Sequence, residues 1–345
     1  MRKFLLSSTS IVAAATIASY ASADVSVTGN FDWKYTNISS NVTASDGTSM
    51  AQDHEVVISF SNKTDSGLTI GGRFDMDGDT AGLDESSVSI AGGFGTIVLG
   101  ANDGVSDAFG VTEQDVIADE PHLGKFSAAA IADTSATTTV GIATNAGEVN
   151  VSGDDNKIAY FTPAMGGFRA GYSMSDAGVG AVSDNVTDMG FSYTFPLEGG
   201  SVLAEYNQVT KDGDADDEEY KAKNYGVTVT MGAMTVIAST MSAEEATAGS
   251  NILTEDIEAT GIGVSYDLGG GIIIAASSME SEDSVDKTAA GAKEKYSSNI
   301  GEVSYSIAPG LTANITYNDY DYKAGGAGTT ADGGSITQLT INATF

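Results

Sequence analysis

Cysteine is absent from the 345-residue sequence, and proline occurs only 4 times. Without cysteine, disulfides, thiol catalysis and cysteine-ligated zinc sites are excluded. The two histidines, His54 and His122, are too few for a histidine-rich metal site. Basic residues are scarce as well: 15 stand against 47 acidic ones, which gives a formal net charge of -32. Because like charges repel, neither nucleic acid nor an anionic membrane surface is an expected partner.

Long apolar runs are missing too, with one exception at the N-terminus. No later segment supplies the ~20 apolar residues of a membrane helix, so a helical membrane protein is excluded. The exception, residues 1–23, begins with Arg2 and Lys3, continues with a short apolar core and ends on Ala-Ser-Ala. This pattern is typical of a secretory signal peptide, and we expect cleavage near Ala23-Asp24 and export from the cytoplasm. The alternative is an uncleaved anchor, for which the core is too short.

The remaining chain alternates apolar and polar residues with a period of two. From Val25 to Tyr35 every second residue is mostly apolar, as in a strand with one apolar face. The pattern recurs in sixteen segments, which are joined alternately by short Gly- or Pro-containing turns and by long polar connections. The predicted strands are 25–37, 52–61, 68–77, 82–91, 95–101, 157–162, 168–175, 186–195, 201–210, 221–230, 234–242, 258–267, 272–280, 294–307, 311–321 and 333–345.

An even number of strands with alternating short and long connections is typical of a transmembrane β-barrel. We therefore predict an all-β fold, in which residues 24–345 form a 16-stranded antiparallel transmembrane β-barrel with short periplasmic turns and long extracellular loops. A soluble barrel or sandwich is the alternative, and it would pack its apolar face inward. Here the second face of every strand is mostly Ser, Thr, Asn, Gly or charged, as a water-filled lumen requires.

Several stretches resemble the general (non-specific) porins of Gram-negative outer membranes, most closely the alphaproteobacterial type. They are 64–68 (TDSGL), 93–100 (GFGTIVLG), 174–180 (MSDAGVG), 264–271 (VSYDLGGG), and a C-terminal stretch with Leu339, Ile341 and Phe345 that resembles the assembly signal of the family. The resemblance implies a homotrimer surrounded by outer-membrane lipid and lipopolysaccharide and inserted by the barrel-assembly machinery through its C-terminus. It also implies a third loop that folds into the barrel as a constriction.

The longest connection, 102–156, is where this constriction loop is expected, and a solvated surface loop is the alternative. Its acidic residues are Asp103, Asp107, Glu113, Asp115, Asp119, Glu120 and Asp133, against Lys125 and His122. By strand alternation, the expected pore wall contains Lys34, Asp53, Glu55, Arg73, Asp75 and Arg169. The family has basic residues around the positions of Asp53 and Glu55, so this sequence departs from it there. The predicted pore is mainly acidic.

Together these features predict a passive diffusion channel for small hydrophilic solutes and ions that prefers cations. A secreted or surface-attached acidic calcium-binding β-protein, similar to an adhesin, is the alternative. The stretches 211–219 and 75–80 space their acids like calcium loops but lack the glycine of an EF-hand, so no cofactor is expected beyond loosely bound Ca2+ in acidic loops. No nucleophile elbow or phosphate-binding loop is present in the sequence, and no enzymatic activity is expected.

Overall fold

The computed structural model describes residues 24–42, 46–78, 83–119, 142–147, 155–176, 185–212, 219–246, 253–285, 293–323 and 331–345. The expected signal peptide, 1–23, lies outside these residues, so its cleavage stays a prediction.

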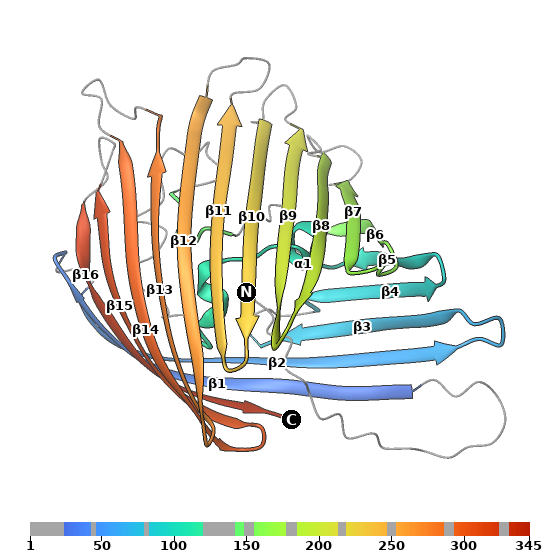
Figure 1. Ribbon diagram of the computed structural model, residues 1–345, viewed down its shortest axis with the longest axis horizontal. Helices are drawn as coiled ribbons and strands as arrows, with labels where there is room; N and C mark the ends of the chain where they lie inside the picture. The colour runs from blue at the N-terminus through green and yellow to red at the C-terminus, as the bar shows by residue number, and fades with distance from the viewer. Residues whose placement is uncertain are drawn as a thin grey trace.

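Within the described residues, sixteen strands form one closed antiparallel barrel. The strands are β1 (Asp24–Ser40), β2 (Gly47–Lys63), β3 (Thr69–Asp77), β4 (Glu85–Gly92), β5 (Gly95–Ala101), β6 (Asn156–Phe161), β7 (Phe168–Asp176), β8 (Asn185–Leu197), β9 (Gly200–Asp212), β10 (Glu219–Met231), β11 (Met234–Ala246), β12 (Leu253–Gly269), β13 (Ile272–Asp283), β14 (Glu294–Ala308), β15 (Leu311–Lys323) and β16 (Asp332–Thr344). Each strand pairs with its neighbours in the chain, and β16 closes the barrel against β1 (Figure 1). The predicted 16-stranded antiparallel barrel is confirmed.

The two ends of the barrel differ in their connections. One end, here called the turn end, carries tight turns in which Gly199, Gly232 and Gly310 have positive φ angles of 82, 57 and 74°. Glycine adopts these angles without steric cost, which lets adjacent strands reverse within a few residues. The other end, here called the loop end, carries the longer connections, including the one between β5 and β6.

The outer face of the barrel is an apolar belt. Ile262, Val264 and Tyr266 on β12 point outward and are exposed, as are Val303 and Tyr305 on β14. Large apolar side chains in contact with water are unfavourable, whereas the hydrocarbon core of a membrane accepts them. Among the described residues, no helix is long and apolar enough to cross a membrane.

Toward the loop end the polarity of the two faces is reversed. On β10, the inward Tyr220 and Ala222 are buried, while the outward Glu219, Lys221 and Lys223 are exposed. Inward residues of this kind form one apolar cluster: Ile38, Val186, Val209, Tyr220, Ala222, Met241, Ala243, Ile257, Ala259, Met279, Tyr296, Tyr320, Tyr322 and Ile336, with Ile142 and Ala146 of the long connection. The expectation of a polar inner face on every strand is therefore wrong at this end, where the barrel has an apolar core like a soluble one.

Candidate functional site: a loop along the inner wall

The long connection between β5 and β6 enters the barrel. Its described part, residues 102–119 and 142–147, is here called the inner loop. It contains α1 (Val105–Ala108), which contacts β7, β8 and β9, and the 3-10 helix η1 (Glu113–Val116), which contacts β11, β12 and β13. Figure 1 shows α1 enclosed by the strands. The two helices therefore lie along the wall from β7 to β13, and the inner loop lies inside the barrel as expected for a constriction loop.

Successive strands each contribute a polar side chain that fixes the inner loop. The contacts are Val105 N to Ser173 Oγ on β7 (2.9 Å), Ser106 Oγ to Asp188 Oδ1 on β8 (3.1 Å), Asn207 Nδ2 on β9 to Phe109 O (3.1 Å), Asn224 Nδ2 on β10 to Val111 O (3.1 Å) and Glu113 N to Ser239 Oγ on β11 (3.0 Å). The loop backbone is buried here, and these bonds replace its contacts with water. The wall thus positions the loop strand by strand.

Glycines in the interiors of the strands make room for the inner loop. A Cβ atom at Gly190 of β8 would lie 2.6 Å from Phe109, and one at Gly226 of β10 would lie 1.5 Å from Val111. On β12, a Cβ atom at Gly261 would lie 2.4 Å from the Glu113 side chain. Real side chains do not approach this closely, so any larger residue would displace the loop. Sequence analysis did not single out these glycines, although each lies at an inward position of a predicted strand.

Glu113 departs from its expected place among the acids of the constriction. Its side chain is fully buried against the wall. The Oε2 atom accepts hydrogen bonds from Thr112 Oγ1 (2.8 Å), Ser239 Oγ (3.1 Å) and Ala146 N (3.1 Å). Glu113 therefore ties together the two limbs of the inner loop and β11. Asp115 is half-buried and accepts a hydrogen bond from Thr112 N (2.9 Å), which caps η1.

A cavity of about 480 Å³ lies between the start of the inner loop and the wall. It is lined from the inner loop by Asn102, Asp103, Gly104, Asp107 and Ala108, and from β2 to β6 by Ser59, Phe60, Ser61, Thr69, Gly71, Gly72, Arg73, Glu85, Ser87, Ser89, Val98 and Phe161. Asp103 and Asp107, both expected in the constriction, thus lie on the loop side. Asp107 is exposed and Asp103 is half-buried.

Carboxylates surround the only arginine of this cavity lining. Among the described residues, the Arg73 guanidinium contacts Glu55 (3.8 Å), Glu85 (3.1 Å) and Asp75. The two last carboxylates are almost completely buried. One positive charge against three negative ones leaves this wall acidic, as the sequence predicts. The strand alternation did not identify Glu85 as a residue of this wall, although Glu85 of β4 pairs with the predicted wall residue Asp75 of β3.

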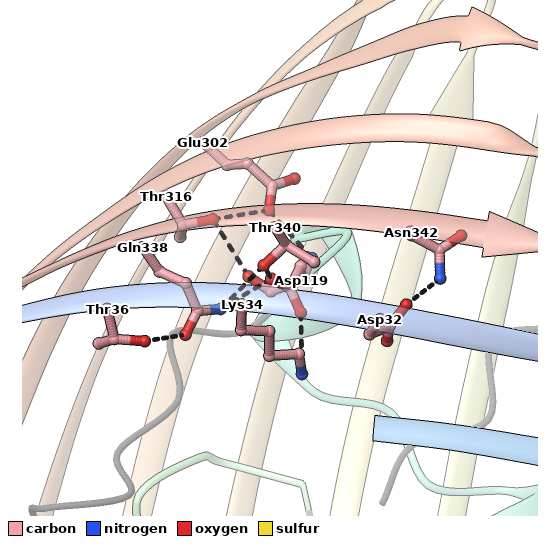
Figure 2. A network of polar contacts seen from close by, with 9 residues as sticks. All are labelled: Asp32, Lys34, Thr36, Asp119, Glu302, Thr316, Gln338, Thr340 and Asn342. Atoms are coloured by element: carbon pink, nitrogen blue, oxygen red, sulfur yellow. Dashed lines mark hydrogen bonds and ion pairs between the residues drawn. The ribbon is translucent and has the colours of Figure 1, made fainter. Parts of the chain in front are cut away.

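The other predicted wall residues have different surroundings. Asp53 lies opposite Asp32 in the β1–β2 pair. Lys34 forms an ion pair with Asp119 of the inner loop at 3.3 Å (Figure 2). The exposed Arg169 guanidinium lies 4.9 Å from the ring centroid of Phe161 and 5.6 Å from that of Phe109, in a cation-π arrangement.

Some predicted residues fall outside the described part of the chain. Glu120 and Asp133 are among them, together with His122 and Lys125. The acidic stretches 211–219 and 75–80 are also only partly described, so calcium binding there stays a prediction. In the ranges that are described, no group of His, Asp and Glu side chains is arranged to hold a metal ion.

The C-terminal residues complete the closing pair of strands. Phe345 N donates to Gly29 O and Gly29 N donates to Phe345 O, each at 3.0 Å. Ile341 and Leu339 lie opposite Trp33 and Tyr35 of β1. The Phe345 ring covers Gly29, where a Cβ atom would lie 2.6 Å from it.

A closed barrel with an apolar outer belt and a loop along its inner wall defines the class of membrane β-barrel channels. Comparison with known proteins adds the family. A model of the Gram-negative porin family matches residues 8–325. The chain belongs to the Gram-negative porin family, whose members are channels of the outer membrane.

Solved structures support the fold at low sequence identity. OmpT, an outer membrane protein of Vibrio cholerae folded in vitro, is 13% identical with a TM-score of 0.68, and the match covers 96% of this chain and 100% of that chain. An anion-selective porin from Comamonas acidovorans is 14% identical with a TM-score of 0.64, and the match covers 94% of this chain and 100% of that porin. Another solved porin is 18% identical with a TM-score of 0.58, and the match covers 93% of this chain and 100% of that porin. No curated protein matches the sequence.

Proposed function

We propose that this porin is a water-filled channel for passive diffusion of small hydrophilic solutes and ions, with a preference for cations. The observation that carries the proposal is the excess of carboxylates at the cavity between the inner loop and β2–β6. Glu55, Asp75 and Glu85 surround Arg73 on one side, and Asp103 and Asp107 lie on the other. Fixed negative charge in a narrow passage concentrates cations and excludes anions.

The fold alone does not determine which ions are preferred. An anion-selective porin with a similar fold differs in its side chains, and selectivity depends on those side chains. The resemblance implies basic residues near Asp53 and Glu55, and this chain has acidic ones there. The proposed cation preference therefore rests on the side chains of this chain and not on its fold.

Reversal potentials across a KCl gradient test the proposal. Purified protein in a planar bilayer should be cation-selective in dilute salt, where the Debye length is ~10 Å at 0.1 M. The preference should weaken toward molar KCl, where screening shortens that length to ~3 Å. Anion selectivity, or a cation preference unaffected by salt, would contradict the charge assignment. Absence of any conductance would contradict the channel itself.

We further propose that the protein is a homotrimer in contact with outer-membrane lipid and lipopolysaccharide, assembled through its C-terminus after removal of residues 1–23. The strand lengths support an interface on one side of the barrel. β4, β5 and β6 have 8, 7 and 6 residues, whereas a membrane-spanning strand needs ~9–11. A wall of such short strands is better covered by other copies of the chain than by lipid. Chemical cross-linking in detergent should yield a trimer, and a monomer as the only product would refute this assembly.

A further inference from the structure

Asp119, at the end of the first limb of the inner loop, contacts four consecutive strands (Figure 2). Its main-chain N donates to Glu302 Oε2 of β14 at 3.0 Å, and its main-chain O accepts from Thr316 Oγ1 of β15 at 3.1 Å. Its carboxylate accepts from Gln338 Nε2 of β16 at 2.7 Å and from Thr340 Oγ1 of the same strand. The ion pair with Lys34 adds β1. All polar atoms of Asp119 thus have partners on the wall.

Glu302 holds the loop backbone beside this residue. Its two carboxylate oxygens accept hydrogen bonds from Ala118 N (2.7 Å) and Asp119 N (3.0 Å), and Thr316 Oγ1 also donates to it (3.1 Å). The Glu302 side chain is almost completely buried, and the side chain of Asp119 is only 10% exposed. Hydrogen bonds to ionised groups are stronger than neutral ones, and water competes little for them in such a site. The contact therefore holds one loop residue in one position.

Two of the partner strands are the ones that close the barrel. Lys34 of β1 lies directly opposite Thr340 of β16, and Thr36 lies opposite Gln338. Thr36 Oγ1 also donates to Gln338 Oε1 at 3.1 Å. Asp119 binds Lys34 on one strand and Gln338 and Thr340 on the other, so it bridges the pair formed by the first and last strands of the barrel.

We propose that Asp119 is a positioning residue that clasps the inner loop to the closing strand pair β1–β16. The side-chain contact adds to the main-chain bonds with Glu302 and Thr316 that hold the end of the loop, and it stabilises the closure of the barrel. The contacts between the loop and β7–β11 do not involve these strands, so they do not replace it. The effect on conductance rests on the proposed channel function, whereas the effect on barrel closure does not.

The experiment compares two alanine variants of the full-length protein that each remove one acid from the inner loop. Asp119→Ala removes the clasp, and Asp107→Ala is the matched control at an exposed position on the same loop. In detergent gels, Asp119→Ala should convert from the folded to the unfolded band at a lower temperature than both the wild type and Asp107→Ala. In bilayers, Asp119→Ala should raise the single-channel conductance and the permeability to neutral sugars.

A second variant approaches the same contact from the wall. Lys34→Met leaves the loop sequence intact and should change both measurements in the same direction as Asp119→Ala, by less. The conversion temperature of the double variant should be no lower than that of Asp119→Ala alone. The effects of substituting two residues in direct contact are not additive. Additive effects would overturn the proposal, as would a conversion temperature and sugar permeability of Asp119→Ala equal to those of Asp107→Ala. If the wild type does not conduct, the channel function fails, and the conversion temperatures still test the clasp.

Discussion

Two regions of the inner wall differ in how closely they pack against the inner loop. From β7 to β12, glycines leave spaces that Phe109, Val111 and Glu113 fill, and polar side chains fix the loop backbone. From β2 to β4, the wall lies across a cavity from the loop, with Arg73 among carboxylates. In the proposed channel, the first region supports the constriction and the second faces the passage. Substitutions in the first should therefore change structure, and those in the second should change selectivity.

The largest expected effect is on the glycine-lined region. Gly226→Val should displace the inner loop, because the new Cβ would overlap Val111. Overpacking of a well-packed interior typically destabilises a protein by ~1–3 kcal/mol. Here the inner loop can move away from the wall instead, so the strands need not deform. We expect a lower yield of folded barrel and a wider channel, measured as increased single-channel conductance.

The matched control for this substitution is a glycine in the interior of β14. A Cβ atom at Gly301 would have no heavy atom within 4 Å, so Gly301→Val should leave both yield and conductance unchanged. Equal conductance of wild type and Gly226→Val in a folded barrel would show that the glycine spaces do not determine the position of the loop.

The next effect compares a buried acid with an exposed one. Glu113→Ala leaves Ser239 Oγ and Ala146 N without their buried acceptor, which typically costs ~1–3 kcal/mol per unsatisfied group. We expect a lower conversion temperature in detergent gels but nearly unchanged ion selectivity at the same channel size. A strong loss of cation preference with unaltered conductance would instead place the Glu113 carboxylate in the passage.

Asp107→Asn should have the opposite profile. The side chain is exposed and lines the cavity, so its neutral replacement of the same shape should lower the conversion temperature less than Glu113→Ala does. Reversal potentials in dilute KCl should shift toward lower cation preference, and the shift should diminish toward molar salt as screening increases. Unaltered reversal potentials at low salt would exclude Asp107 from the ion path.

Sequence alternation was sufficient to predict the strands because the membrane imposes it along the chain. The alternation did not predict the ends of the strands, where the surroundings of the two faces change. β12 begins at Leu253 rather than at 258, since Ile257 points inward there and Glu258 outward. Between the apolar belt and the loop end, the outer face of the barrel is in contact with water and the inner face is in contact with the inner loop. The apolar residues of each strand therefore change from the outer face to the inner face.

The site was predictable only where a strand fixes the direction of a side chain. Arg73 and Asp75 lie on the inner face of β3, and Glu302 could have been found by the same alternation, since Val303 points outward. The inner loop has no such period, so the charge of Glu113 gave no indication that it is buried against β11. The glycine spaces depend on loop residues far away in the sequence, which alternation within one strand does not reveal.

The smallest expected effect concerns Arg169, which lies on β7 beneath Phe109 of the inner loop and thus joins the two regions. Arg169→Gln removes an exposed cation-π contact typically worth ~0.5–1 kcal/mol, so the conversion temperature should hardly change. It also removes a positive charge facing the lumen, and reversal potentials should shift slightly toward stronger cation preference, opposite to Asp107→Asn. Water around the exposed guanidinium screens its field, which keeps the shift small. Arg169→Lys, which keeps the charge but not the planar stacking, should match the wild type in dilute KCl. A shift shared by the lysine and glutamine variants would mean that stacking on Phe109 and Phe161, rather than charge, is how Arg169 affects the passage.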